Sequence, residues 1–370
     1  EISECLVGSE MCIRDSRYGM PLGRVITAKK FKSVQQALSL SSKIVWFFPN
    51  LTKKAIEGAQ YTNGNTLIIG PPGQGKSVLV KYIFLWLTFL GQKILYIDPK
   101  NETVLFFKRA LDKFGHIPEF KALYQRINFV SLSSEERYRG MLDPLLFLPR
   151  EEAIQTARNV LENFGEVTTD SHTASDKKTL ILDSVNAVMK GKGKKHLTKV
   201  IEVIREKDPK LANLISGHNV GLGKILLGND YSEPIRFENQ INVLGTQGLK
   251  IPTQAEIDSG RLNNEQIAGM SIMEVIMKMT TIFSTDKTED AAIIFDEAKG
   301  FEDTAQGRFL IEGSLRQGRA NMTDIYLVTQ AFMDYDKEDK KELLSYKFAF
   351  RPNQKEAQKK VLEFFGMDTN

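Results

Sequence analysis

The residues with the clearest chemistry are eight consecutive ones, Gly70-Pro71-Pro72-Gly73-Gln74-Gly75-Lys76-Ser77, which fit the pattern G-x-x-x-x-G-K-[ST] at every fixed position. The glycines allow backbone conformations in which successive N–H groups point inward around phosphate oxygens. Lys76 can reach the β- and γ-phosphates of a nucleotide, and the Ser77 hydroxyl can complete the coordination of Mg²⁺. The helix expected after this run also favours an anion at its N-terminus. The run therefore predicts a site for ATP and Mg²⁺, formed by Gly70, Pro71, Pro72, Gly73, Gln74, Gly75, Lys76, Ser77 and Val78.

An acidic pair, Asp296-Glu297, directly follows the apolar residues Ala292–Phe295. A phosphate loop needs a partner that holds the metal ion and activates the attacking water. We expect Asp296 to hold Mg²⁺ through water and Glu297 to act as the general base. Acidic pairs at strand ends are common by chance, so this interpretation depends on the phosphate loop being present.

Three polar residues downstream could complete such a site. Gln330 follows the apolar run Ile325–Val328, where its amide could contact the γ-phosphate or the attacking water. Arg316 and Arg319 come just before that run and could act as arginine fingers on the ATP of a neighbouring subunit, with Arg319 the preferred residue. The alternative for the two arginines is a basic turn at the C-terminus of a helix.

The run Asp98-Pro99-Lys100-Asn101-Glu102 offers two further carboxylates after a strand-like segment. They could face the nucleotide, or they could cap the helix that follows. The spacing favours neither use.

The positions of these residues require a sheet whose strands alternate with helices. Short apolar segments rich in β-branched residues predict the strands, and a longer one from Val78 to about Leu90 predicts the helix after the phosphate loop. This alternation is typical of an α/β fold with a mostly parallel sheet. A second helix, around Gln266–Ile282, carries four methionines that we expect to pack in the core. The expected strands are Thr66–Ile69, Lys93–Ile97, Ile127–Leu132, Ile241–Leu244, Ala292–Phe295, Ile325–Val328 and Lys347–Arg351.

The domain organisation follows from changes of pattern along the chain. Apolar residues recur at helical spacing within 150–234, where no strand is evident, so we expect a helical insertion there. The P-loop ATPase domain would then comprise residues 61–149 and 235–370. Residues 17–60 are expected to be the end of a truncated N-terminal domain and a linker, and residues 1–16 a non-native read-through sequence. Both cysteines lie in this last segment, which argues against a disulfide framework or a zinc–thiolate site.

The composition is that of an ordinary globular protein. Of 370 residues, 42% are hydrophobic and 26% charged, which argues against a collagen, a coiled-coil rod or a disordered tail. The formal net charge of +4 is too small to require a nucleic-acid partner by itself. The longest strongly apolar run, Ile83–Leu90, is far shorter than the roughly 20 residues that cross a bilayer. We therefore expect no transmembrane segment.

Taken together, the motifs resemble those of the TraC-like conjugative ATPases of type IV secretion systems, in the HerA–FtsK group of RecA-like motors. The similarity extends from about residue 40 to the end of the chain. Two positions depart from the family's pattern and bear on which of its subgroups the chain resembles. Asn101 stands where a glycine is usual, and Lys299-Gly300 follows Ala298 where an aromatic residue is common. The motifs that carry the resemblance, in the order of the family, are Gly70–Ser77, Tyr96–Glu102, Phe295–Ala298, Arg316–Arg319 and Val328–Gln330.

The resemblance implies a RecA-like P-loop NTPase fold with an inserted all-helical subdomain. It also implies a homohexameric, Mg²⁺-dependent ATPase that is cytoplasmic and peripherally associated with the membrane. Such an enzyme powers assembly of the secretion channel or substrate transfer through it, and its partners are channel components at the inner face of the membrane. The residues that match functional positions of the family are Lys76, Ser77, Asp296, Glu297, Arg319 and Gln330.

Two other functions remain open at this point. A DNA-pumping translocase or coupling-type ATPase would need a basic surface, and Lys177–Lys210 contains ten Lys or Arg against four Asp or Glu. A charge run is more often a solvated loop, and no aromatic residues interleave there to stack bases. The other alternative is a nucleotide-binding scaffold that does not hydrolyse ATP. Glu297 and Gln330 argue against it, because a scaffold needs no group that activates water.

Overall fold

The computed structural model describes most of the chain from Asn63 onward and three short segments before it. The expected read-through sequence, residues 1–16, lies outside the described residues, and so does the departure at Lys299-Gly300. The described residues are 19–24, 33–39, 44–49, 63–167, 172–236, 239–285, 290–298, 301, 305–321, 323–330, 335, 338–352 and 354–367.

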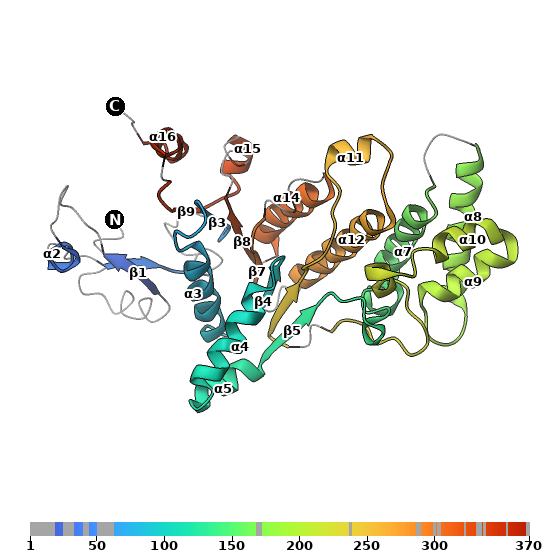
Figure 1. Ribbon diagram of the computed structural model, residues 1–370, viewed down its shortest axis with the longest axis horizontal. Helices are drawn as coiled ribbons and strands as arrows, with labels where there is room; N and C mark the ends of the chain where they lie inside the picture. The colour runs from blue at the N-terminus through green and yellow to red at the C-terminus, as the bar shows by residue number, and fades with distance from the viewer. Residues whose placement is uncertain are drawn as a thin grey trace.

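A seven-stranded sheet forms the centre of the molecule, with the strand order β5-β6-β4-β7-β8-β3-β9 (Figure 1). Each pair of neighbouring strands is parallel. The expected α/β fold with a mostly parallel sheet is therefore confirmed, and each expected strand is present to within about two residues. The strands are β3 (Thr66–Ile69), β4 (Lys93–Asp98), β5 (Ile127–Ser131), β6 (Ile241–Gly245), β7 (Ala291–Phe295), β8 (Thr323–Thr329) and β9 (Tyr346–Ala349).

Helices cover both faces of this sheet. Successive strand residues point to opposite faces, so each strand contributes side chains to two cores. Ile68, Ile94 and Tyr96 pack toward α3 (Lys76–Phe89), α4 (Glu102–Phe114) and α5 (Pro118–Gln125). Leu67, Leu95 and Ile97 pack in the core on the other side, to which α7 (Arg150–Phe164), α12 (Asn264–Thr285) and α14 (Ala305–Ala320) contribute. The inner strands β6, β4, β7, β8 and β3 are buried on both faces, as a parallel sheet requires, and the edge strands β5 and β9 are partly exposed.

Helix α12 is long and apolar enough to pass for a membrane span by length and composition. Most of it is buried within the protein: Met273, Ile276 and Met279 are almost inaccessible to solvent. The methionines at 273 and 279 therefore pack in the core, as we expected, and α12 is the central helix of one side of the sheet.

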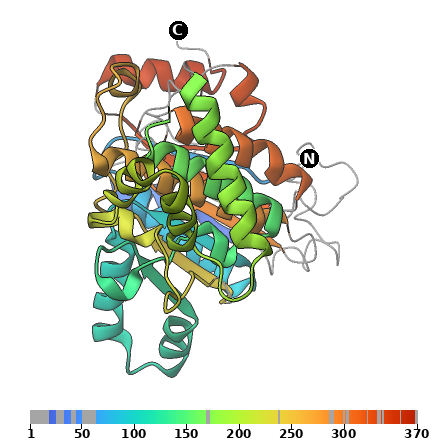
Figure 2. The same ribbon diagram turned by 90° about the vertical axis from the view of Figure 1, so that its right-hand side faces the viewer.

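Helices also make up the segment between β5 and β6, apart from loops and a 3₁₀ turn on either side. They lie at one end of the long axis in Figure 1, and Figure 2 shows them in front of the sheet when the molecule is viewed from that end. Among the described residues of 150–234 there is no strand. The elements are η2 (Glu136–Tyr138), α6 (Pro144–Phe147), α7, α8 (His172–Lys190), α9 (Leu197–Lys207), α10 (Pro209–Ser216) and η3 (Gly221–Ile225).

A two-stranded antiparallel sheet lies at the opposite end of the long axis in Figure 1. Its strands β1 (Met20–Arg24) and β2 (Ile44–Phe47) contribute Met20 and Phe47 to the core around α3. Phe47 also packs edge-on against aromatic residues of β9. The remaining short helices are α2 (Val34–Ser39), α11 (Gln254–Asp258), α15 (Glu338–Lys341) and α16 (Lys355–Phe364).

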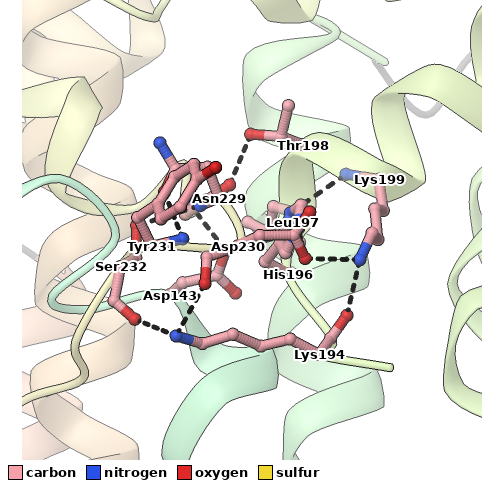
Figure 3. Close-up of polar contacts among 11 residues, drawn as sticks. Asp143, Lys194, His196, Leu197, Thr198, Lys199, Asn229, Asp230, Tyr231 and Ser232 are labelled. Carbon is pink, nitrogen blue, oxygen red and sulfur yellow. Dashed lines mark hydrogen bonds and ion pairs between the residues drawn. The ribbon is translucent and has the colours of Figure 1, made fainter. Parts of the chain in front are cut away.

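Asp143 joins three parts of the helical segment (Figure 3). Its carboxylate is completely buried and accepts hydrogen bonds from the backbone N–H groups of Leu145 (3.0 Å), Leu197 (2.7 Å) and Gly228 (2.9 Å). Gly228 has to be a glycine, because a Cβ there would lie 2.8 Å from Asp143 Oδ2. One side chain thus fixes the start of α9 and the loop after η3 against α6.

We expect Asp143→Ala to lower the free energy of unfolding by about 3 kcal/mol or more, because it leaves three buried N–H groups without acceptors. Burial raises the pKa of Asp143 to about 7, from 3.8. Between about pH 4 and pH 7 the carboxyl group is protonated in the folded state and ionised in the unfolded state. The contribution of Asp143 to the free energy of unfolding therefore decreases as the pH rises through this range. Denaturant unfolding at pH 5 and pH 8 should show the larger difference from wild type at pH 5.

The matched control is Asp208→Ala, which removes a partly buried cap at the start of α10. Its expected cost is about 1 kcal/mol. Equal costs for the two variants would show that Asp143 is an ordinary helix cap.

Candidate functional site

A cleft of about 370 Å³ lies at the carboxyl ends of β3, β4, β7 and β8. In a parallel sheet these ends meet at one edge, which is where ligands bind in open α/β folds. The structure thus brings together the phosphate loop, the acidic pair and Gln330, although they are far apart in the sequence. The cleft is lined by Pro72, Gly73, Gly75, Lys76, Ser77, Val78, Asp98, Pro99, Lys100, Glu102, Asp296, Glu297, Val328, Thr329 and Gln330.

The phosphate loop has the backbone that its glycines permit. Gly70, Gly73 and Gly75 all have positive φ angles, of 153°, 75° and 101°, which other residues rarely adopt. Helix α3 begins at Lys76, and no side chain caps its first turn. This turn, whose residues Lys76, Ser77 and Val78 line the cleft, thus has no side-chain acceptor for its N–H groups, which suits a phosphate.

Lys76 is buried, and its ammonium donates hydrogen bonds to the carbonyls of Gly70 and of Pro71 (2.9 Å). Burial lowers the pKa of Lys76, while the nearby carboxylates of Glu297 and Asp296 raise it. A buried cation at the floor of a cleft, held only by carbonyls of the same loop, is well placed to bind an anion.

Asp296 accepts a hydrogen bond from the hydroxyl of Tyr96, at 2.7 Å from Oδ2. Burial raises the pKa of Asp296, and the bond from Tyr96 opposes that rise. Burial also raises the pKa of Tyr96 well above 10, so the phenol stays protonated and donates. Tyr96 was missed by the sequence interpretation; the available signal was a tyrosine within an otherwise aliphatic buried strand, whose hydroxyl needs a partner.

The donors around Asp296 suit Mg²⁺. The Ser77 hydroxyl and the Asp296 carboxylate line the same cleft, and oxygen atoms are the ligands that this cation prefers. Ser77 is at the second position of α3, next to Lys76. Both expected metal ligands therefore line one cleft, and their role in holding Mg²⁺ stays a prediction.

Each carboxylate oxygen of Glu297 contacts one side chain. Its Oε1 accepts a hydrogen bond from Gln330 Nε2 (2.9 Å), and its Oε2 forms an ion pair with Lys100. Its φ of 60° is in the left-handed region, where a residue other than glycine is strained. The flanking backbone is fixed, because the N–H of Asp296 bonds to Ile97 and that of Ala298 to Val328. Gln330 thus lies beside Glu297, and the action of both groups on one water stays a prediction.

Asp98 accepts hydrogen bonds at the start of the next helix, and both Asp98 and Glu102 also line the cleft, so the two uses that the spacing left open do not exclude each other. Its buried carboxylate accepts hydrogen bonds from the N–H groups of Lys100 (3.1 Å) and Thr103 (2.7 Å). Asn101 has a φ of 55°, which explains why a glycine is usual there and why an asparagine is tolerated. Lys100, which the sequence interpretation did not consider, extends into the cleft.

Arg316 and Arg319 lie at the C-terminal end of α14, directly before β8. This position agrees with the alternative of a basic segment at a helix C-terminus, and the role of the two residues as arginine fingers stays a prediction. The helix continues through Gly318, where a Cβ would lie 2.6 Å from the carbonyl oxygen of Thr323. A glycine there allows α14 to pack closely against the start of β8. Arg316 is exposed and does not line the cleft.

A second cavity of about 310 Å³ adjoins the start of the phosphate loop. Gln330 lines both cavities. Phe350 contributes an aromatic surface, and Gln354 a polar group. The complete lining is Ile69, Gly70, Pro71, Gln330, Phe350, Pro352, Gln354, Ala357 and Val361.

The basic run around Lys190–Lys199 has an internal use (Figure 3). Lys194 donates to the carbonyls of Asp230 (3.2 Å) and Ser232, and Lys199 forms an ion pair with Asp230 (2.6 Å). These lysines hold their loop against residues 229–232. They are therefore only partly the solvated charges expected from the sequence, and they do not favour a DNA-binding surface.

Comparisons with known proteins agree with this fold. The AAA-like domain family matches residues 43–370. The chain is 27% identical to the uncharacterized protein YddE of Bacillus subtilis (strain 168) over 369 residues, which are 95% of this chain and 43% of YddE. It thus spans less than half the length of that relative.

Solved structures with a similar fold include VirB4 of Thermoanaerobacter pseudethanolicus, with a TM-score of 0.57 and 15% identity over 95% of this chain and 88% of VirB4. The bacterial conjugative coupling protein TrwBdeltaN70 in complex with sulphate matches with a TM-score of 0.45 and 13% identity, over 81% and 74% of the two chains. The match to VirB4 confirms the fold expected from the sequence. The roles of the individual site residues stay predictions.

We expect Tyr96→Phe to weaken the binding of Mg²⁺·ATP about tenfold, because the orientation of Asp296 depends on this hydroxyl. Titration of a fluorescent ATP analogue in the presence of Mg²⁺ measures the effect. Tyr82→Phe on α3, whose hydroxyl makes only a long contact to Pro21 (3.4 Å), is the control. Unchanged affinity in Tyr96→Phe would show that Asp296 is positioned by its backbone alone.

Proposed function

This chain belongs to the AAA-like domain family, and from this we propose that it hydrolyses ATP to power assembly of, or substrate transfer through, a conjugative type IV secretion system. The observation that carries the ATPase proposal is the cleft in which Lys76, Ser77, Asp296, Glu297 and Gln330 converge. The secretion role is supported by the motifs that resemble the TraC-like ATPases.

The phosphate loop and α3 would bind the triphosphate. Backbone N–H groups at the helix start and the ammonium of Lys76 surround the expected position of the β- and γ-phosphates. Ser77 and Asp296 would hold Mg²⁺, which would neutralise charge on the phosphate oxygens when bound. Residues lining the second cavity, with Phe350 as an apolar surface, would accommodate the base.

Hydrolysis would proceed by in-line attack of water on the γ-phosphorus. The new P–O bond forms as the bond to the β-phosphate oxygen breaks, and ADP leaves. Glu297 would accept the proton of the attacking water, and Gln330 would orient that water. Their contact of 2.9 Å places the two side chains around one point of the cleft.

The arginines of α14 would act between subunits. They precede β8, while the cleft lies at its far end, and the seven residues of β8 extend over about 20 Å. Arg319 is therefore poorly placed to reach the phosphate of its own subunit. In a homohexameric ring with head-to-tail contacts, it would reach the ATP of the next subunit.

Partners and location follow from the resemblance alone. We propose a cytoplasmic enzyme, peripherally associated with the membrane, that contacts secretion-channel components. DNA remains an alternative partner, and DNA-stimulated ATP turnover would support it.

The ATPase proposal is tested by phosphate release from Mg²⁺·ATP. Wild-type protein should release phosphate, and Lys76→Ala should abolish release while remaining folded, because Lys76 stabilises charge on the transferred phosphoryl group. Glu297→Gln should bind Mg²⁺·ATP and fail to hydrolyse it, since an amide cannot accept the proton. Normal turnover in folded Lys76→Ala would refute the proposed site.

The intersubunit role is tested by mixing variants. Arg319→Ala should bind ATP normally and lose turnover on the order of 10³-fold, because an arginine finger acts on transition-state charge. Mixing Arg319→Ala with Lys76→Ala subunits should restore part of the activity, since some interfaces then combine an intact arginine with an intact phosphate loop. No recovery in mixed rings that demonstrably form would contradict this role.

A further inference from the structure

Both carboxylate oxygens of Glu297 are engaged by side chains of this chain. Lys100 pairs with Oε2, and Gln330 donates to Oε1 at 2.9 Å. A carboxylate that is to accept a proton from water needs a free lone pair directed at that water. The two contacts occupy two of the roughly four acceptor positions of the carboxylate, and a proton arriving at Oε2 is repelled by the ammonium paired with it, so release of Lys100 favours Glu297 as a base.

Lys100 is the contact that can be exchanged. Its side chain is 51% exposed, at the start of the segment leading into α4, and ends in a flexible ammonium. An ion pair this exposed contributes little to stability, so its loss costs little. The backbone on both sides of Glu297 is fixed by hydrogen bonds to β4 and β8, so the carboxylate stays in place when Lys100 leaves.

Lys100 and Lys76 face the same part of the cleft. Both line it, from the loop after β4 and from the start of α3. Besides burial, the charge of Lys100 lowers the pKa of Lys76, as expected for two cations that share one space. An anion with several charged oxygens placed between them would relieve this repulsion and attract Lys100 away from Glu297.

We propose that Lys100 recognises the γ-phosphate, and that it exchanges its ion pair with Glu297 for one with this group. The exchange frees Oε2 of Glu297 for the attacking water while Gln330 keeps the carboxylate oriented. Lys100 is then a residue that distinguishes ATP from ADP, because ADP lacks the group that draws it from Glu297. This inference rests on the proposed function.

The test is a double-mutant cycle on nucleotide affinity, with the full chain and Mg²⁺. Binding of a non-hydrolysable ATP analogue and of ADP is measured by calorimetry for wild type, Lys100→Met, Glu297→Gln and the double variant. Lys100→Met should weaken binding of the ATP analogue roughly tenfold, which is the contribution of one charge-assisted hydrogen bond. The affinity for ADP should change less than about twofold. Lys100→Arg should retain most of the preference for the ATP analogue.

Glu297→Gln should increase the affinity for the ATP analogue, because Lys100 is no longer held by a carboxylate. This increase in affinity should vanish in the double variant. Lys108→Met is the matched control, since Lys108 is exposed on α4, the helix that follows Lys100, and does not line the cleft. An equal loss for both nucleotides in Lys100→Met, or a gain in Glu297→Gln that persists without Lys100, would overturn the inference. A wild-type chain that binds neither nucleotide would refute the proposed function, and this inference with it.

Discussion

The parallel pairing of β3, β8, β7 and β4 determines where every charged group of the cleft lies. Because parallel strands end at one edge, the phosphate loop, Asp296, Gln330 and the Asp98 loop meet there. Strand β8 lies between the strand of the phosphate loop and the strand of the acidic pair. Gln330, at the end of β8, therefore lies next to Glu297 and lines the same cleft as Lys76.

Charges at this edge are partly buried, so each needs a partner within the chain. Lys76 uses carbonyls of its own loop, Asp296 uses the Tyr96 hydroxyl, and Glu297 uses Lys100 and Gln330. These partners differ in how firmly they are held. Tyr96 is fully buried, whereas the Lys100 side chain is half exposed. The proposed exchange thus involves the exposed partner of Glu297, and the buried partner of Asp296 stays in place.

The sequence predicted the strands and the phosphate loop because both depend on local signals: apolar β-branched runs and a fixed glycine pattern. It could not predict the contact of Tyr96 with Asp296, because those residues are 200 positions apart and meet only through the register of β4 against β7. The close packing of Gly318 against Thr323 could not be predicted either, because it depends on how the end of α14 meets the start of β8. The internal use of Lys194 depends likewise on a distant loop.

The central claim is that ATP binds between Lys76 and Lys100 and that this binding rearranges the charges of the cleft. A crystal structure of the chain with Mg²⁺ and a non-hydrolysable ATP analogue tests it most directly. We predict that Lys76 leaves the carbonyls of Gly70 and Pro71 for the phosphates, and that Lys100 leaves Glu297 for the γ-phosphate. A water should then lie between Glu297 and the γ-phosphorus. Nucleotide bound elsewhere, or bound in the cleft with both original contacts intact, would contradict the account.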